Sequence, residues 1–384
     1  MESNKRIALW HNILWSRYKG RVFSELSTLS PPRGMTVEFF QIAATDSGRA
    51  SLSSVDMSYH GYPFELIFDC AYDAIPSHLL VRKLFWSVWT SNAELIILPG
   101  YHRPEYWAML FAAILRRKKK VVFSDSTRYD QPYSFSKGFL KRFFFSWCDG
   151  FLSYGERARS YLLEYGVPAE KVFRRCQAAA LPAEYSAEAA LQQRRETAPS
   201  MDRPRFLYVG RLSPEKSLDV LLQAFSRVRQ VMPAATLVLV GAGPQRGELV
   251  ALAESLEVAD AVTFAGGMDA VALGREYAKA TCLVLPSQSE PWGLVVNEAL
   301  SYGCPVVVSH RCGCVPELVE GKKTGIVFEA GNVDDLASSL VTSPKEFSNI
   351  ETVAKDCVEL ISEFSPKASA LAILAACMQI IGRG

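Results

Sequence analysis

Two cations stand where the sequence predicts a strand, a turn and then a helix. Arg211 lies just after the predicted strand of residues 206–209, and Lys216 falls in the first turn of a helix expected from Pro214. A cation at a helix N-terminus is unfavourable by a few tenths to about 1 kcal/mol, because it faces the positive end of the helix dipole. The pair is favoured there when an anion is bound, and a diphosphate would fit.

A second strand–loop–helix segment carries two carboxylates. Residues 282–286 are typical of a buried strand, and a helix is predicted to start near Trp292 or Gly293. Glu290 lies in the loop, whereas Glu298 lies on an otherwise apolar helix face and is expected to be partly buried. Hydroxyl groups of a sugar or ribose would supply the donors that such a carboxylate needs. From these residues alone, a capping Glu290 and an ordinary helical Glu298 explain the pattern equally well.

The two segments together resemble glycosyltransferase family 4, a family of retaining nucleotide-sugar transferases. The stretch VGRLSPEKSLDVLL contains the R-x4-K motif of that family at Arg211 and Lys216, and SEPWGLVVNEAL contains its E-x7-E motif at Glu290 and Glu298. Three stretches, LVLVGAGP, VTFAGG and GCPVVVSHRCGCVPELV, match the rest of the family pattern in order. The resemblance extends over residues 206–328 and is weak before them.

The resemblance implies an α/β fold of two Rossmann-like domains that face each other across a cleft, the GT-B arrangement. A length of 384 residues agrees with two or three domains. The predicted division is an acceptor-binding domain over residues 1–185, a linker over 186–204, a nucleotide-sugar-binding domain over 205–365, and a final helix over 366–384 that crosses back to the first domain.

The resemblance also assigns roles to the motif residues. Glu298 is expected to bind the donor ribose, while Arg211 and Lys216 hold the diphosphate and stabilise the charge that develops as the glycosidic bond breaks. Glu290 is expected to orient the sugar, and front-face transfer with retention needs no protein nucleophile. The donor is expected to be a UDP-sugar, with no cofactor and no metal ion. Further donor contacts are expected from Trp292, Gly293 and Leu294 and from Gly210, Gly266 and Gly20.

Two polar residues that follow predicted strands of the first domain are candidate acceptor-side catalytic residues. His102 follows the strand of residues 94–100, and Asp125 lies at the end of the strand of residues 121–127. Both are expected at the carboxyl edge of a parallel sheet, where ligands of open α/β folds bind. An ordinary loop histidine remains the alternative for His102, as does a simple turn for Gly20.

The first half of the chain is basic, although the whole chain has a net charge of only +2. Residues 1–185 contain 24 Lys and Arg against 17 Asp and Glu, a net of +7. Lys137, Lys141 and Arg142 alternate with aromatic residues up to Trp147, a pattern that fits either contact with an anionic membrane or core packing. A glycan or lipid-linked acceptor is therefore expected, with the protein cytoplasmic or at the inner face of a membrane, and no nucleic-acid partner.

Other functions remain open at this point. The chain could use a soluble small-molecule acceptor, or be a nucleotide-sugar epimerase or a phosphorylase of the same double-Rossmann fold. It could also be a non-catalytic scaffold of a glycan assembly complex, although the complete motif set argues against loss of the site. The nine scattered cysteines favour reduced thiols, and His310 with Cys312 and Cys314 is too small a set for a metal site.

Overall fold

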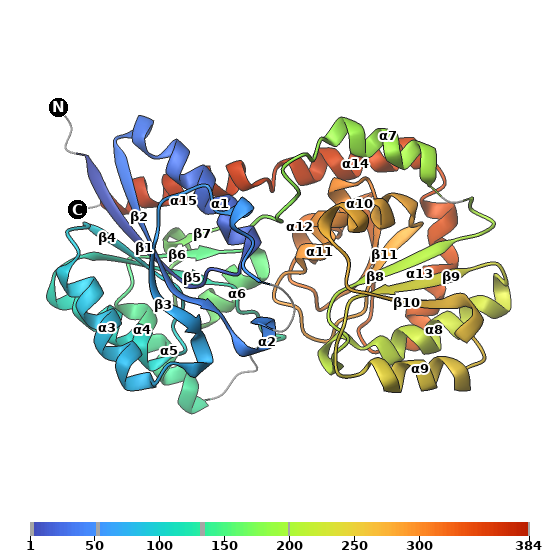
Figure 1. Ribbon diagram of the computed structural model, residues 1–384, viewed down its shortest axis with the longest axis horizontal. Helices are drawn as coiled ribbons and strands as arrows, with labels where there is room; N and C mark the ends of the chain where they lie inside the picture. Colours follow the sequence, from blue (N-terminus) through green and yellow to red (C-terminus); the bar gives the residue numbers. More distant parts are fainter. Residues whose placement is uncertain (1–3, 51–53, 131–134, 199, 383–384) are drawn as a thin grey trace. The chain divides into compact units, whose positions relative to one another are not determined.

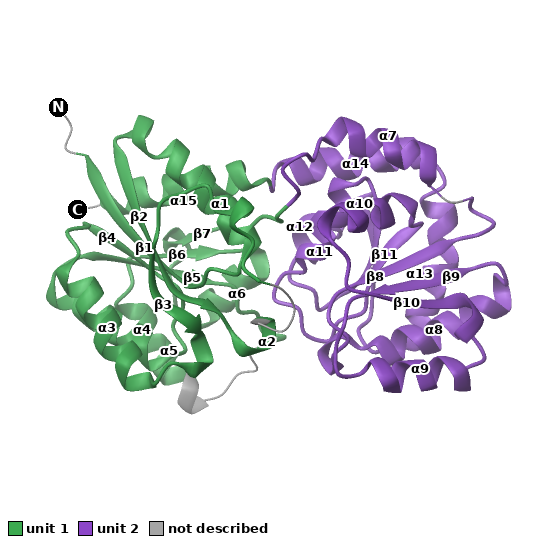
Figure 2. Cartoon of the chain, in the orientation of Figure 1, with its two compact units in different colours: residues 1–180, 365–384 green, residues 181–364 purple. Residues whose placement is uncertain are grey.

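The computed structural model describes residues 4–50, 54–130, 135–198 and 200–382. The chain divides into two compact units, one formed by residues 1–180 with 365–384 and the other by residues 181–364 (Figure 2). Each unit is built on one parallel sheet covered by helices (Figure 1). The predicted α/β class with two Rossmann-like units is confirmed.

The first unit contains a seven-stranded sheet in the order β3-β2-β1-β4-β5-β6-β7, in which neighbouring strands are parallel. Its central strands are short apolar runs that are buried on both faces, as is usual for parallel sheets. The strands are β1 (Lys5–Ile13), β2 (Met35–Thr45), β3 (Glu65–Ala71), β4 (Leu95–Leu98), β5 (Lys119–Ser124), β6 (Gly150–Ser153) and β7 (Val172–Phe173).

Helices cover both faces of this sheet and form two separate cores. Ile7 and Leu9 of β1 pack with the first and last helices of the chain, α1 and α15. Ala8 and Trp10 face the other side and pack with α3, α4, α5 and α6, because successive side chains of a strand point to opposite faces. The helices are α1 (Arg17–Leu29), α2 (Ser47–Ala50), α3 (Ser77–Thr90), α4 (Pro104–Leu115), α5 (Phe135–Ser146), α6 (Glu156–Glu164) and α15 (Pro366–Ile381).

The second unit contains a six-stranded parallel sheet in the order β10-β9-β8-β11-β12-β13. The strand order reverses between β8 and β11, so the loops after these two strands lie side by side at the carboxyl edge. The strands are β8 (Arg205–Val209), β9 (Thr236–Val240), β10 (Val262–Gly266), β11 (Cys282–Leu285), β12 (Val306–Ser309) and β13 (Gly325–Phe328). The helices are α7 (Ala187–Thr197), α8 (Leu218–Val231), α9 (Arg246–Ser255), α10 (Ala270–Lys279), α11 (Leu294–Ser301), α12 (Val315–Leu318), α13 (Val333–Glu346) and α14 (Ile350–Ser362).

The prediction of a linker over residues 186–204 is wrong. Helix α7 occupies most of this stretch, packs against α10 and α14, and belongs to the second unit. Its anchor is Arg194, which is 3% exposed and donates to the carbonyl oxygens of Tyr277 and Ala278 at 3.3 and 3.0 Å. A helix that is held by a buried arginine lacks the 3.6-residue repeat of apolar side chains by which helices are predicted. For this reason α7 was not predicted from the sequence.

The stretch Ile350–Ile381 is, among the described helical residues, the one long and apolar enough to cross a membrane by length and composition. It consists of two helices that are separated before Pro366 and belong to different units. Ser365 caps the second helix by accepting a hydrogen bond from the amide of Ala368. Helix α14 packs on α11 and α15 on α1, and 44% of the apolar window is buried in these contacts and within the units.

Candidate functional site

The loop after β8 carries the predicted cations, but its local structure differs from the prediction. A continuous helix from Pro214 is not formed, because residues 214–216 make a 3-10 turn and α8 begins at Leu218. Ser217 separates the two segments with left-handed backbone angles, at φ 50°. Lys216 therefore lies ahead of α8, on the loop, and not inside its first turn.

The two predicted motifs meet in space. Nζ of Lys216 lies 2.5 Å from Oε2 of Glu290, and the two side chains are only 13% and 17% exposed. The amide of Gln288 donates to the carbonyl oxygen of Glu215 at 2.9 Å, which ties the loop after β11 to the turn after β8. A charge-assisted hydrogen bond sheltered from water is stronger than an exposed ion pair. Lys216 and Glu290 thus form one polar centre at the point where the strand order reverses.

Arg211 lies at a more open position. Its side chain is 66% exposed, and its guanidinium lies 3.0 Å from Glu215, which also accepts a hydrogen bond from the hydroxyl of Ser213. Burial acts to raise the pKa of Glu215, but the hydrogen bond from Ser213 and the charge of Arg211 outweigh it and hold the pKa below its usual value. Because exposed ion pairs contribute at most about 1 kcal/mol, Arg211 can exchange Glu215 for another anion at little cost.

Glu298 is half-buried on α11 and is oriented by a neighbouring helix. The hydroxyl of Tyr277, on α10, donates to Oε2 of Glu298 at 2.8 Å. Tyr277 is buried and stacks on Tyr302 with ring centroids 5.8 Å apart. Burial and the nearby carboxylate of Glu298 raise the pKa of Tyr277 well above its usual value, so this hydroxyl remains a donor at neutral pH. Tyr277 could not be predicted from the sequence, because a contact between two helices leaves no local pattern.

The backbone makes a sharp corner between β11 and α11. Gly293 is the N-cap residue at φ 99°, a conformation that residues with a side chain rarely adopt, and the helix begins at Leu294, close to the predicted start. The indole of Trp292 is buried and donates to Asn297 at 2.8 Å, so the Trp292 side chain anchors the loop. The first amides of any helix lack intrahelical partners, and those of α11 can meet an anion or a sugar hydroxyl.

The remaining glycines predicted to approach the donor differ in position. Gly210 directly follows β8 and has φ 152°, whereas Gly266 is the last residue of the edge strand β10 and has φ 70°. Gly20 is buried within α1, and a Cβ there would lie 2.7 Å from the carbonyl oxygen of Tyr59 and 2.8 Å from the ring of His60. Packing within the first unit is enough to explain why this residue is small, and the phosphate contact of Gly20 stays a prediction.

His102 and Asp125 lie together in a pocket of the first unit. The pocket has a volume of about 260 Å³ and lies at the ends of β1, β2, β4 and β5. Burial lowers the pKa of His102, and the charge of Arg103 lowers it further, so the imidazole is neutral at neutral pH and can accept a proton. The structure thus brings together the two residues predicted on the acceptor side.

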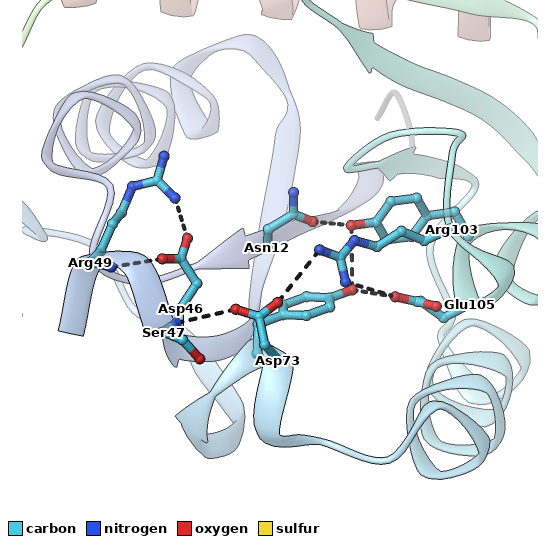
Figure 3. Close-up of polar contacts among 9 residues, drawn as sticks. Asn12, Asp46, Ser47, Arg49, Asp73, Arg103 and Glu105 are labelled. Atoms are coloured by element: carbon cyan, nitrogen blue, oxygen red, sulfur yellow. Dashed lines mark hydrogen bonds and ion pairs between the residues drawn. The ribbon is translucent and has the colours of Figure 1, made fainter. Parts of the chain in front are cut away.

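Two arginines of this pocket are held by carboxylates (Figure 3). Arg49 pairs with Asp46, and Arg103 lies 3.9 Å from Asp73 and 4.0 Å from Glu105. A network of aromatic hydroxyls fixes this arrangement, since the hydroxyl of Tyr72 donates to Glu105 at 2.7 Å and that of Tyr106 to Asn12 at 2.5 Å. These residues leave no joint signal in the sequence, because they lie in β1, after β2, after β3 and after β4.

Comparisons with known proteins agree with this geometry. Residues 190–342 match the family model of glycosyl transferases group 1. The matched segment is 153 of the 384 residues long. It lies within the second unit and contains both motifs. The predicted family resemblance is therefore confirmed.

Individual relatives match 36–44% of the chain. A sulfoquinovosyl transferase of Arabidopsis thaliana is 33% identical over 44% of this chain and 32% of its own length. A GDP-mannose-dependent phosphatidylinositol monomannoside mannosyltransferase of Mycobacterium tuberculosis is 35% identical over 36% of this chain and 38% of its own length. The chain thus spans about a third of the length of these relatives. Anabaena HepE, solved with UDP, covers 98% of the chain at a TM-score of 0.72 and 17% identity, over 100% of its own length, which shows a shared fold.

Proposed function

We propose that this protein is a retaining glycosyltransferase that moves a sugar from a nucleotide diphosphate sugar to an acceptor hydroxyl. The observation that carries the proposal is the contact of Lys216 with Glu290, which unites the two motifs beside β8 and β11. The UDP named in the HepE structure supports a UDP-sugar donor, although the mannosyltransferase relative is named for GDP-mannose.

Each donor group has a matching residue in the second unit. A carboxylate can accept more than one hydrogen bond, so Tyr277 orients Glu298 while ribose hydroxyls donate to the same group. Lys216 and Arg211 bind the diphosphate, and Glu290 then exchanges part of its contact with Lys216 for hydroxyls of the sugar. The stationary Lys216 charge stabilises the negative charge that develops on the leaving diphosphate.

The transfer step needs no protein nucleophile. The bond between the anomeric carbon and the diphosphate oxygen breaks, and the acceptor oxygen forms its bond on the same face of the sugar. The acceptor proton passes to the leaving phosphate oxygen, which is the nearest base on that face. His102 and Asp125 are proposed to hold the acceptor hydroxyl as hydrogen-bond acceptors. Independence of metal ions and of cofactors is part of the same proposal.

The pocket of the first unit favours a neutral, polyhydroxylated acceptor group. Asp46, Asp73 and Asp125 outnumber Arg49 and Arg103 there, and both arginines already face carboxylates. Such paired groups bind sugar hydroxyls well but leave little positive potential for a phosphate. A glycan, or the sugar of a lipid-linked acceptor at the inner face of a membrane, is therefore proposed. The lipid-named mannosyltransferase relative supports the second form.

The proposal is tested by screening nucleotide sugars by thermal shift and then following the bound donor with saccharide acceptors. Slow release of UDP without acceptor, and faster release with acceptor, is the expected result. Conversion of the donor to an epimer without acceptor would identify an epimerase, and a requirement for inorganic phosphate would identify a phosphorylase. A protein that binds no nucleotide at all would be a scaffold.

A further inference from the structure

Helices α3, α4 and α5 cover one face of the first sheet (Figure 1). Large apolar side chains of these helices are exposed to solvent. Soluble proteins rarely expose a contiguous apolar area of this kind without a binding partner. The side chains concerned are between 46% and 71% exposed, and they are Trp86 on α3, Phe111 and Leu115 on α4, and Phe139, Leu140, Phe143 and Trp147 on and just after α5.

Ring contacts join these helices into one surface, the α3–α5 face. Trp107 of α4 stacks on Phe143 of α5, with centroids 6.3 Å apart and planes within 8°, and Phe143 contacts Trp147 at 6.4 Å. Between α4 and α3, the guanidinium of Arg116, which follows α4, lies 5.6 Å from the ring centroid of Trp89. These contacts join α4 to α5 through Trp107 and Phe143, and α4 to α3 through Arg116 and Trp89.

The charge on this face has one sign. Arg82, Lys83, Arg116, Arg117 and Arg142 are exposed on it. The carboxylate within the described residues of the three helices is Glu105, which is 2% exposed and accepts a hydrogen bond from Tyr72. A second copy of this chain would meet these cations with its own, so self-association through the face is opposed by repulsion.

We propose that the α3–α5 face docks on a phospholipid bilayer that contains anionic lipids. Cations attract the negative surface, and aromatic rings enter the headgroup region, where one end of the ring is apolar and the other wet. The docking residues include Arg142 and Trp147 of the stretch that the sequence indicated. In the same stretch, however, Phe144 and Phe145 are buried, and Lys141 contacts the hydroxyl of Tyr161. The side chain of Lys137 lies outside the described residues.

The face is connected to the acceptor pocket through α4. Glu105 lies in the first turn of α4 and holds Arg103 beside the pocket, whereas Phe111 and Leu115 lie on the later turns. At about 1.5 Å per residue, the helix links the two over less than about 20 Å. This step rests on the proposed function: a sugar attached to a membrane lipid would reach the pocket while the face lies on the bilayer.

The test is co-sedimentation of the full chain with vesicles of equal parts phosphatidylcholine and phosphatidylglycerol, against phosphatidylcholine alone. Binding is expected to the anionic vesicles and to weaken with added salt. Changing Arg82, Lys83 and Arg142 together to Glu is expected to lower the partition coefficient by about tenfold or more. The matched control changes Arg203, Lys322 and Lys323 of the second unit to Glu and is expected to have little effect.

A second pair of variants tests the aromatic part. Phe111→Ser with Phe143→Ser is expected to weaken binding and to reduce quenching of tryptophan fluorescence by brominated lipid. The control, Val231→Ser with Met378→Ser, removes exposed apolar side chains elsewhere. Absence of vesicle binding at low salt, or an equal loss of binding in the control variants, would overturn the proposal. A dimer that dissociates when Arg82, Lys83 and Arg142 are changed to Glu would also overturn it, because the face would then join two copies of the chain.

Thermal shift with UDP separates this proposal from the proposed function. All four variants are expected to bind UDP as the wild type does, since none changes a donor residue. A wild-type protein that binds vesicles but no nucleotide would contradict the transferase and leave the docking surface standing.

Discussion

At the scale of single residues, the two motif cations have different surroundings and should contribute unequally. Lys216 is sheltered and contacts Glu290, whereas Arg211 is mostly exposed and contacts Glu215. A sheltered charge is screened less by water and salt. Lys216 is therefore expected to be the main ligand of the diphosphate.

Lys216→Ala is expected to weaken UDP binding by about 1.5–3 kcal/mol, the range for a hydrogen bond to a charged group. Arg211→Ala is expected to weaken it by no more than about 1 kcal/mol, because that side chain is exposed. Isothermal titration with UDP measures both, and Lys322→Ala, at an exposed lysine of the same unit, serves as the control. Unchanged UDP affinity in Lys216→Ala would contradict the diphosphate assignment.

The two glutamates are expected to separate binding from turnover. Glu298→Gln removes the charge that Tyr277 orients, and should weaken nucleotide binding through the ribose. Glu290→Gln should lower kcat more than it lowers UDP affinity, because UDP lacks the sugar that Glu290 is proposed to orient. Titration with UDP and steady-state kinetics measure the two effects. A Glu290→Gln variant that binds UDP far less well than Glu298→Gln does would reverse the roles.

At the scale of elements, the donor site depends on the corner between β11 and α11. Gly293 has φ 99°, and a Cβ there would lie 3.1 Å from Leu285. Gly293→Ala is expected to destabilise the unit by roughly 1–2 kcal/mol and to weaken donor binding as the corner shifts. Gly247→Ala is the matched control, because that position is helical and its Cβ would meet nothing within 4 Å. Equal thermal midpoints and UDP affinities for the two variants would contradict this role.

The sequence predicted elements with strong local patterns and missed those held by distant contacts. Buried strands such as β11 and the start of α11 were predictable, because apolar runs and chain-breaking residues mark them locally. Helix α7 was missed because its anchor, Arg194, bonds carbonyl groups more than 80 residues away. The contact of Tyr277 with Glu298 and that of Arg103 with Asp73 were missed for the same reason, since their partners lie 21 and 30 residues away in the chain.

At the scale of the whole molecule, buried histidines of the first unit predict how stability depends on pH. Burial lowers the pKa of His11 from 6.5 to about 3, and the positive charge of Lys19 contributes to the lowering. Burial likewise lowers the pKa of His60 to about 4. The unfolded chain therefore binds protons first as the pH falls below about 6.5. Stability contributed by the neutral imidazoles is present above that pH and is lost on acidification.

Unfolding by denaturant at pH 7 and pH 5 measures this loss. Protonation of His11 in the unfolded chain is expected to reduce the free energy of unfolding by about 1.4 kcal/mol for each pH unit below 6.5. His11→Gln should make stability depend less on pH, whereas His78→Gln, at an exposed position of α3, should leave the dependence unchanged. Equal pH slopes for the wild type and His11→Gln would contradict the assignment.

The measurement that tests the central claim most directly is NMR of the glycoside formed from the UDP-sugar that the protein consumes, with and without EDTA. We expect a product whose anomeric proton coupling shows the same configuration as the donor, formed at the same rate in EDTA. An inverted product, or activity that is lost in EDTA and restored by Mg²⁺, would contradict the account.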